Sequence, residues 1–463
     1  MNSFVKNNQL TGLLLGILAC IALVFLPIAQ LDHNGQLFLG LTMMTVVFWV
    51  FQVANMGFIS GVYLALLVIF QVADAHVVFS PWVGSTLYFV VGAYIIASAV
   101  KHSGLGDRIA MYVITKHISS FRSIIVSIFV LQVLLSLMIP NSWARSLIIM
   151  SVMKQVIDNA QVVKKDAITI GFTVFASSVP ASMLFLTGES AINLLIVEYS
   201  GMHIGWLQWL LYMGPPAIVA ILLTLVSILL FFKPQKEIQV DKSVMKQKLA
   251  DMGKLSPKEI RVLIWLSIAI IVWLTDSWHG IDIGWATLAI TMLMGFPVIG
   301  EVVDAQQWND VPFHILIFLT AAIAIGRVGA VTGSNEFVAH LLFPETVPTN
   351  IILMSLVIAG VAVAIHMVLG SVIAVLSVVA PAAIAFTEPL GISPLIPLFI
   401  VYVAVFGHYV FPFHSISILV GVGEDNGLYS NKEVMKLGLP LLIMVSVVVL
   451  AVQLPWWRLI GLF

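Results

Sequence analysis

The stretch Met138–Ser151, MIPNSWARSLIIMS, decides how this chain folds. It lies inside a long apolar segment, yet a proline, an asparagine, a serine and an arginine occur within six residues. Lipid offers backbone groups no hydrogen-bond partner, so such a break is tolerated only where protein or a watery cavity surrounds it. We interpret Pro140–Ser146 as the tip of a re-entrant hairpin and as half of an anion-binding site. In the alternative interpretation, Arg145 marks a helix end and reaches toward the lipid headgroups.

The composition places the rest of the chain in a membrane as well. Of 463 residues, 60% are hydrophobic and 9% are charged, whereas soluble domains carry about 25% charged residues. We therefore expect an all-α polytopic membrane protein with about 11 transmembrane segments. The single cysteine, Cys20, gives neither a disulfide nor a metal signature. The apolar run 10–29 is long enough to be a membrane helix rather than a signal peptide, and no room remains for a nucleic-acid-binding domain.

Apolar runs and one hydrophilic loop divide the chain into five parts. We expect scaffold helices in 1–80, a first repeat in 81–232, a basic loop in 233–260, further scaffold helices in 261–300 and a second repeat in 309–460. The segment 233–261 holds eight of the 21 lysines and arginines. By the positive-inside rule, this loop and the N-terminus are predicted to be cytoplasmic, in a plasma (inner) membrane.

The two repeats match in their order of features. Ser103–Ala110 resembles Thr332–Ala339, and each stretch precedes an uncharged, hairpin-like segment. The predicted hairpins are 121–157 and 346–388, the predicted broken helices are 168–200 and 394–423, and Gly-Pro pairs follow at 214–215 and near 438–440. Identity between the halves is low, so the ordered series of matches carries the inference of an internal repeat.

Charges give the two hairpins opposite orientations. The first is flanked by basic residues on both sides, namely Lys116, Arg122, Lys154, Lys164 and Lys165. Only 31 residues separate Arg122 from Lys154, and two full crossings need roughly 40, so this segment should enter the membrane and turn back.

The second hairpin is flanked by Glu345 and Glu388, and no lysine or arginine occurs between Arg327 and Lys432. Both of its ends are therefore expected on the far side. This segment is long enough to cross twice, so its re-entrance follows from the repeat. Two hairpins that enter from opposite faces, each with a broken helix, indicate an inverted-repeat transporter with a site at the midplane.

Four breaks should meet at that site, at 140–146, 187–193, 369–373 and 411–417. Half-helix N-termini favour anions, and exposed carbonyl groups can coordinate Na⁺. The residues predicted to bind substrate are Asn141, Ser142, Arg145, Thr187, Gly188, Glu189, Asn193, Ser371, His414 and Ser415. Those predicted to bind a coupling cation are Asn141, Gly188, Gly370 and Ser371.

Several roles remain open from the residues alone. Arg145 is either a bidentate clamp on a carboxylate or sulfate or the structural partner of Glu189. Glu189 is either that partner or a proton or cation site, and polar residues between packed helices are often only interhelical contacts. His366, His408 and His414 either relay protons or are simply hydrogen-bonded. No metal site is expected, because no close pair such as HExxH occurs.

Taken together, these stretches resemble the divalent anion:sodium symporter (DASS) family over about residues 80–460. Pro140–Arg145 stands where that family's first hairpin carries Pro-Ser-Asn-Thr-Ala-Arg, and Ala181–Asn193 is similar to its first broken helix. His366–Ser371 is similar to the approach to its second signature, and Gly421–Gly438 resembles the close of its second broken helix. The chain departs from the family pattern at Trp143, where a small hydroxyl residue is usual, and at the apolar residues 372–373.

The resemblance implies an elevator-type homodimer in which a transport domain of hairpins and broken helices moves against a scaffold. It also implies a membrane transporter of a small anion, a di- or tricarboxylate or sulfate, rather than an enzyme. No cofactor is expected, and Na⁺ or H⁺ would be the coupling ion unless anions are exchanged. The alternatives are a cation/proton antiporter that uses Glu189 and His414, an intramembrane enzyme that uses the buried histidines, and a non-transporting receptor.

Overall fold

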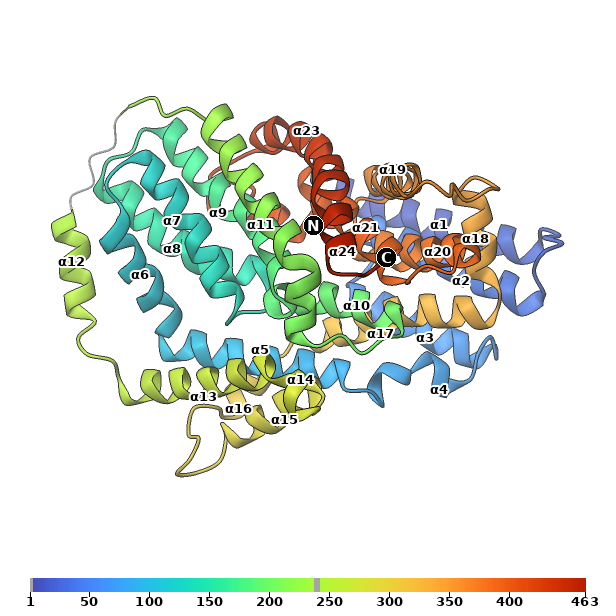
Figure 1. The fold of residues 1–463 in the computed structure, drawn as a ribbon, viewed down its shortest axis with the longest axis horizontal. Helices are drawn as coiled ribbons and strands as arrows, with labels where there is room; N and C mark the ends of the chain where they lie inside the picture. Colours follow the sequence, from blue (N-terminus) through green and yellow to red (C-terminus); the bar gives the residue numbers. More distant parts are fainter. Residues whose placement is uncertain (1–2, 237–241) are drawn as a thin grey trace.

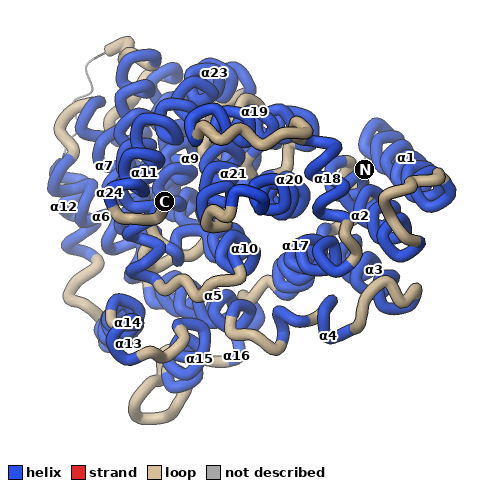
Figure 2. Tube along the Cα trace, turned by 45° about the vertical axis from the view of Figure 1, so that its right-hand side comes forward, coloured by secondary structure: helices blue, strands red, loops and turns tan. Residues whose placement is uncertain are grey.

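A computed structural model gives the fold of the chain and describes residues 3–236 and 242–463. Every regular element in these residues is a helix, as Figure 1 and Figure 2 show. Helices satisfy all their backbone groups internally, which is what a lipid environment requires of the predominantly apolar segments of this sequence. The prediction of an all-α polytopic membrane protein is therefore confirmed.

The helices follow one another in four groups. The first group is α1 (Ser3–Phe25), α2 (His33–Val50), α3 (Met56–Ile69), α4 (Ala75–Val78) and η1 (Ser80–Trp82). The second is α5 (Thr86–Ser103), α6 (Leu105–His117), α7 (Phe121–Ser136), α8 (Ser142–Asn159), α9 (Lys164–Leu184), η2 (Leu186–Glu189), α10 (Ser190–Ser200) and α11 (Trp206–Phe231). The third is α12 (Lys242–Asp251), α13 (Pro257–Leu274), α14 (Asp276–His279), α15 (Ile283–Leu293) and α16 (Ala305–Asn309). The fourth is α17 (Phe313–Val331), α18 (Ser334–Leu342), α19 (Ile351–Leu369), α20 (Val372–Thr387), η3 (Glu388–Leu390), α21 (Leu395–Phe406), η4 (Pro412–His414), α22 (Ile416–Gly421), α23 (Asn431–Val447), η5 (Val448–Gln453) and α24 (Leu454–Leu459).

Two hairpins, α7–α8 and α19–α20, have tips built in the same way. Asn141 caps α8 by accepting a hydrogen bond from the backbone N–H of Ala144 at 3.1 Å. Ser371 caps α20 by accepting from the N–H of Ala374 at 3.4 Å. Each short polar side chain satisfies one of the amide groups that a helix start leaves free. The apolar helices on either side of these caps therefore turn sharply at the polar residues of the sequence.

Two helices are broken, and the breaks share a backbone geometry. The segment α9–η2–α10 is interrupted at Phe185 (φ −114, ψ 146), and α21–η4–α22 is interrupted at Phe411 (φ −119, ψ 156). The residue before the helix that follows each break is non-helical, with a similar φ in both cases: −146 at Glu189 and −142 at Ser415. These matches pair the two halves of the chain residue by residue around the breaks.

Helix length agrees with re-entrance of the first hairpin. Among the described residues, seven helices are long and apolar enough to cross a membrane, or eight if the bent pair α5–α6, at 65°, counts as one span. The helix α7 has only 16 residues, which is short of the roughly 20 that a crossing needs. The helix α19, and α20 together with η3, reach spanning length, but their tip contacts the second break, as described below. The total of about 11 segments remains a prediction.

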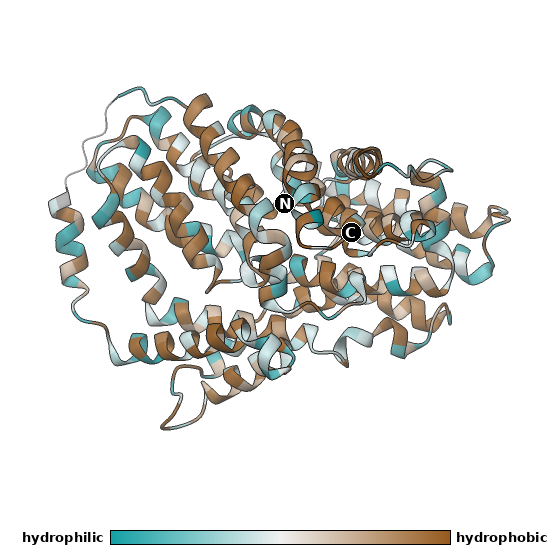
Figure 3. Ribbon diagram, viewed as in Figure 1, coloured by the Kyte–Doolittle hydropathy of each residue, from teal (hydrophilic) through white to brown (hydrophobic). Residues whose placement is uncertain are grey.

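The helices form two neighbouring groups. Figure 1 shows α7, α8, α9 and α11 side by side at one end of the molecule, and α1–α3 with α17–α20 at the other. The helix α5 packs against α15, and α17 packs against α3. Most residues of these helices are hydrophobic, whereas α12 and several connections are more hydrophilic (Figure 3).

The basic loop lies beside the ends of the first hairpin. Arg108 of α6 donates to the carboxylate of Glu259, at the start of α13, at 2.6 Å, and this hydrogen bond holds the pKa of Glu259 below its usual range. Lys248 of α12 donates to the side chain of Gln155 in α8 at 2.8 Å. The open end of the first hairpin and the basic loop are thus on the same face of the molecule.

Close contact between the two halves requires glycine at one position of α9. A Cβ atom at Gly171 would lie 1.9 Å from the carbonyl oxygen of Gly427, which follows α22. A backbone atom cannot move aside as a flexible side chain can. The loop after α22, in the second half of the chain, therefore contacts the backbone of α9 directly.

We expect Gly171→Ala to destabilise the protein by roughly 1–3 kcal/mol, because it forces α9 away from the loop after α22. The measurement is thermal unfolding of the purified protein in detergent. Gly360→Ala is the matched control, since a Cβ there meets nothing within 4 Å, and alanine favours a helix over glycine by about 1 kcal/mol. Equal melting temperatures for the two variants would contradict the close contact.

Candidate functional site

Arg145 braces the first hairpin against the first broken helix. Its side chain is fully buried. The guanidinium donates to the carbonyl oxygens of Ile139 at 2.7 Å and Gly188 at 2.5 Å, and to the hydroxyl of Ser182 at 2.6 Å. A longer bond of 3.4 Å runs from Nε to the side chain of Gln132. Four of the five N–H donors of an arginine therefore face protein acceptors.

These contacts bear on the two roles that the sequence left open for Arg145. Among the residues that the structure describes, Arg145 forms no ion pair, so Glu189 is not its direct partner. To clamp an anion bidentately, the guanidinium would first have to leave its protein acceptors. In this conformation Arg145 joins tip and break, and its predicted contact with substrate remains a prediction.

Glu189 occupies the start of α8 instead. Its carboxylate accepts the backbone N–H of Ser142 at 2.8 Å. Asn141, beside it, donates from its amide to the hydroxyl of Tyr94 at 3.2 Å. A carboxylate at a helix N-terminus is favourable, because the free N–H groups and the helix dipole attract negative charge. Glu189 thus holds, within the protein, a position that suits a carboxylate group.

Asn193 donates hydrogen bonds to backbone carbonyl groups that the first break leaves without a helical partner. Its Nδ2 atom donates to the carbonyl oxygens of Ser182 and Phe185, each at 3.0 Å, and its Oδ1 atom accepts from Tyr402 of α21 at 2.6 Å. The side chain is fully buried, with donors and acceptor all used. The structure shows Asn193 as a link between the two broken helices.

Thr187 and Gly188 lie in the short turn η2 between the two halves of the break. Thr187 is buried and accepts from the indole N–H of Trp206 at 3.5 Å. A Cβ at Gly188 would come within 2.4 Å of the backbone oxygen of Ser182, so only glycine fits. The turn packs too tightly to admit a side chain there, and it directs the Gly188 carbonyl at Arg145.

The second tip packs against the second break. Gly370 has a left-handed backbone (φ 67), and a Cβ there would lie 2.4 Å from the ring of Phe413. Glycine is required both for this conformation and for this contact. Ser371 is half-buried and Ser415 is buried. Gly370, Ser371, His414 and Ser415 are therefore neighbours at one junction, as the repeat predicted.

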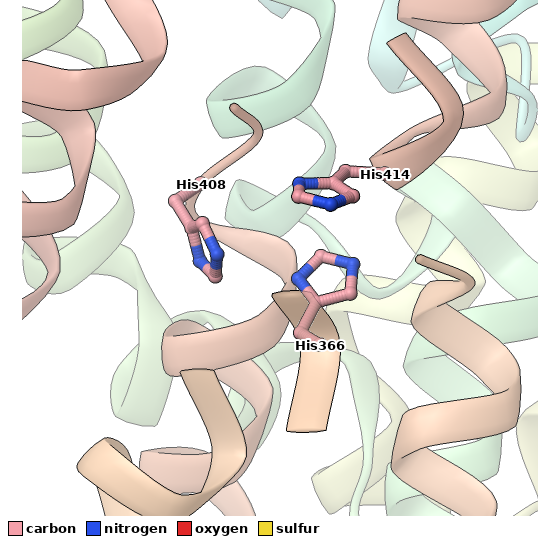
Figure 4. Close-up of side chains that lie close together, drawn as sticks. All are labelled: His366, His408 and His414. Carbon is pink, nitrogen blue, oxygen red and sulfur yellow. The ribbon is translucent and has the colours of Figure 1, made fainter. Parts of the chain in front are cut away.

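Three histidines meet beside this junction: His366 in α19, His408 in the connection after α21, and His414 in η4 (Figure 4). The ring centroids of His366 and His408 are 4.9 Å apart, and those of His366 and His414 are 4.8 Å apart. All three side chains are buried. Sequence reasoning treated each histidine separately, since nothing in their spacing of 42 and 6 positions along the chain signals a contact. The internal repeat was the sequence feature that could have predicted this contact, because it places the three histidines next to the second hairpin tip and the second break.

The donor set of this triad is one that transition metals use, but its hydrogen bonds do not suit a metal. One nitrogen from each ring lies within 4.8 Å of the others. A histidine that binds a metal donates its second N–H to an acceptor. His408 does so toward the carbonyl of Ala404, but Nδ1 of His414 accepts the N–H of Val410, which leaves the hydrogen on Nε2. That nitrogen therefore offers no lone pair, and we do not assign a metal site here.

The family described as "Sodium:sulfate symporter transmembrane region" matches residues 7–463. A membrane protein of Cupriavidus necator is 23% identical over 395 residues, which cover 81% of this chain and 75% of that protein. The sodium-dependent dicarboxylate transporter SdcS of Staphylococcus saprophyticus is 21% identical over 356 residues, 70% of this chain and 68% of the transporter. The crystal structure of the Alcanivorax borkumensis YdaH transporter aligns with a TM-score of 0.51 at 14% identity, over 93% of this chain and 98% of that one. The last likeness concerns the fold alone.

We expect Arg145→Met to lower the melting temperature of the ligand-free protein. It leaves two buried carbonyl groups and a hydroxyl without their donor, at a cost of about 1–3 kcal/mol each. Arg261→Met, which removes the more accessible ion pair with Glu301, should change stability by at most about 1 kcal/mol. Thermal unfolding with and without added anions separates the two roles. A variant of unchanged ligand-free stability that has lost only its stabilisation by anions would instead identify Arg145 as a substrate clamp.

Proposed function

Because this chain belongs to the sodium:sulfate symporter family, we propose that it moves a small divalent anion, a di- or tricarboxylate or sulfate, across the plasma membrane. Membership makes it a membrane transporter of the anion type rather than an enzyme. The coupling ion in this proposal is Na⁺ or H⁺, with anion exchange as the remaining mode. The basic loop and the N-terminus face the cytoplasm, as the excess of lysine and arginine in 233–261 suggests.

The observation that carries the proposal is the pairing of each hairpin tip with a broken helix. Arg145 joins the first tip to Gly188, and Gly370 of the second tip meets Phe413. The two junctions are connected, since α22 packs against α8 and α9, and the hydroxyls of Ser178 and Ser417 are 2.7 Å apart. Helix ends that converge in this way offer N–H groups to an anion and carbonyl groups to a cation.

Within this frame we place the anion at the N-termini of α8 and α20. Asn141, Ser142, Ser371 and Ser415 would supply neutral hydrogen-bond donors. The carbonyl group of Gly370 would face the coupling cation, and so would the second lone pair of the Gly188 carbonyl, whose first accepts from Arg145. Arg145, Thr187 and Asn193 would hold the first break in shape, and His414 would act at the second. Glu189 already supplies a carboxylate to α8, so it would have to shift or lose its charge when an anion binds there.

We further propose that the chain works as a homodimer with an elevator mechanism, in which hairpins and broken helices move against the scaffold. The contacts that such a motion would break lie around Glu198 of α10. Its carboxylate accepts from Thr86 of α5 and pairs with Arg327 of α17. A cavity of about 230 Å³ lies beside this pair. Polar interfaces between packed groups of helices favour relative motion, whereas a large apolar contact would fix them in place.

A cation/proton antiporter of the same architecture is the second candidate. The observation that favours it is the burial of Glu189 at the tip of the first hairpin. An ionisable residue inside a membrane protein is commonly a proton or cation site. This candidate differs from the first in needing no anion.

The test is uptake by proteoliposomes of labelled succinate, citrate, 2-oxoglutarate and sulfate. We expect at least one of these anions to accumulate when an inward Na⁺ gradient, a proton gradient or a counter-anion is supplied. Protein-free liposomes are the baseline. If no anion accumulates under any of the three conditions, the proposed function is wrong.

The variant Glu189→Gln separates the two candidates. Glutamine keeps an oxygen for the N–H of Ser142 but removes the negative charge, so anion uptake should persist with a KM lowered several-fold. The antiporter candidate instead expects cation exchange that this variant abolishes. Glu345→Gln, at an exposed position, is the control and should leave either activity unchanged. Loss of anion uptake in Glu189→Gln with normal folding would contradict the assigned role.

A further inference from the structure

The histidine triad, His366, His408 and His414, contains ring nitrogens that form no hydrogen bond with the described residues of the protein. Both ring nitrogens of His366 and the Nε2 atoms of His408 and His414 are buried without a hydrogen-bond partner in the described structure. Buried polar groups are nearly always paired, and an exception calls for a functional explanation. Four such nitrogens within one cluster point to a ligand that imidazole can bind.

The partners of the outer two rings fix which nitrogen carries hydrogen. The carbonyl of Ala404 can only accept, so Nδ1 of His408, 2.6 Å away, is the donor and its Nε2 keeps a lone pair. The backbone N–H of Val410 can only donate, so Nδ1 of His414, 3.1 Å away, is the acceptor and the hydrogen lies on Nε2. When all three rings are neutral, His414 therefore presents a donor and His408 an acceptor.

His366 lies between these two rings, so hydrogen bonds through the three rings can run in only one direction, from His414 to His408. The ring centroid of His366 is within 5 Å of both neighbours, whereas the rings of His408 and His414 are 6.2 Å apart. A neutral imidazole has one donor and one acceptor, so His366 can accept from His414 and donate to His408. One added proton converts one ring to an imidazolium, and the like charge beside it disfavours a second. The triad is thus suited to hold a single extra positive charge.

The first half of the chain holds a permanent positive charge at the related place. Ser182 and His408 each precede the phenylalanine of their break by three residues, and Gly188 and His414 each follow it by three. Arg145 donates to Ser182 and Gly188. The guanidinium therefore occupies, in the first repeat, the position that lies between His408 and His414 in the second. The permanently charged guanidinium of the first half thus corresponds to the three imidazole bases of the second half.

No fixed charge on the elements that form the triad opposes or neutralises such a cation. The helices α19, α20, α21 and α22 and the turn η4 contain no Asp, Glu, Lys or Arg. Of the titratable tyrosines near the triad, Tyr402 donates to Asn193, and Tyr409 is buried next to His408 in the chain.

Several charged groups on the helices that flank these elements have other partners. On α10, Glu198 pairs with Arg327 of α17. On α23, Glu433 accepts from Ser430, and Lys436 lies over the ring of Phe232, 4.4 Å from its centroid. At the first junction, Arg145 and Glu189 contact their own tip and break. None of these groups therefore supplies a counter-charge to a protonated triad, and the transported anion is the negative charge that the proposal below assigns to it.

We propose that His366, His408 and His414 form the binding site of a coupling proton, taken up with the transported anion and released on the other side. This inference rests on the proposed function. The proton would come from water when the second tip opens, reside on one imidazole of the triad, and return to water after the transport domain has moved. The transported anion supplies the missing negative charge, so each ligand strengthens the binding of the other.

The position of His366 ties protonation to the second hairpin. The N–H of Gly370 at the tip donates to the carbonyl of His366 at 2.8 Å, and Gly370 packs on Phe413, the residue before His414. Opening the tip therefore moves His366 away from His414. A buried imidazolium without a counter-ion is costly, so closure of the tip is favoured when the triad is neutral or when proton and anion are both bound.

The first experiment is nitrogen NMR of protein labelled with ¹⁵N-histidine in lipid bilayers. Ring nitrogen shifts distinguish the two neutral tautomers from the imidazolium. Without anion we expect His408 protonated at Nδ1 and His414 at Nε2, and with succinate one additional imidazolium per chain between about pH 5 and pH 8. His366→Phe should lack this signal, while the exposed His117→Gln should retain it. A triad that stays neutral over this range, with and without succinate, overturns the proposal.

The second experiment counts protons by calorimetric titration of succinate in buffers of different ionisation enthalpy. Wild-type protein and His117→Gln should take up about one proton per succinate bound, and His366→Phe about none. Since the wild-type spectra and titration decide the question, misfolding of the variant would not remove the test. One transition-metal ion per chain, held at the triad and detected by elemental analysis, would also overturn the proposal.

The two proposals fail separately. Anion uptake driven by Na⁺ alone, with no proton uptake on binding, leaves the transporter standing and overturns the role of the triad. A succinate-independent imidazolium in a protein that transports no anion overturns the coupling role together with the proposed function. Uptake driven by a proton gradient and abolished in His366→Phe, with unchanged anion binding to the unprotonated protein, supports both.

Discussion

Backbone groups freed by a break in an apolar helix have to find partners within the protein, and this requirement shapes the centre of the molecule. At the first break, the carbonyls of Ile139 and Gly188 receive the guanidinium of Arg145, and those of Ser182 and Phe185 receive the amide of Asn193. Each side chain joins segments distant in the sequence. The polar residues that make the hairpin unusual are thus also those that hold it in place.

The two halves of the chain meet this requirement with different chemistry. The first uses groups whose protonation does not change near neutral pH, a guanidinium and a carboxamide. The second places three imidazoles where protonation can change, next to a glycine with a left-handed backbone, Gly370. One architecture used twice therefore provides a rigid junction and a junction that can respond to its surroundings. The inverted repeat preserves the geometry of the elements without preserving their chemistry.

The sequence allowed the architecture to be predicted more fully than the site. Apolar runs and flanking charges located the first hairpin and both broken helices, because helix length and the distribution of lysine follow from the bilayer itself. The burial of Arg145 followed from its place in an apolar segment. Its acceptors did not, because they lie across the chain, and neither did the meeting of His366 with His408 and His414. Side-chain pairing depends on which helices pack together, and contacts between distant helices produce no regular pattern of residues in the sequence.

The reach of Arg145 along the chain has a consequence for biogenesis. Its acceptors Ser182 and Gly188 lie 37 and 43 residues further toward the C-terminus. When the first hairpin leaves the ribosome, the arginine at its tip therefore has none of these partners, and lipid provides no substitute. The hairpin has to wait in the translocon or at the interface until α9 and α10 have been synthesised. Insertion of this half is then a concerted step of four helical segments rather than a succession of independent crossings.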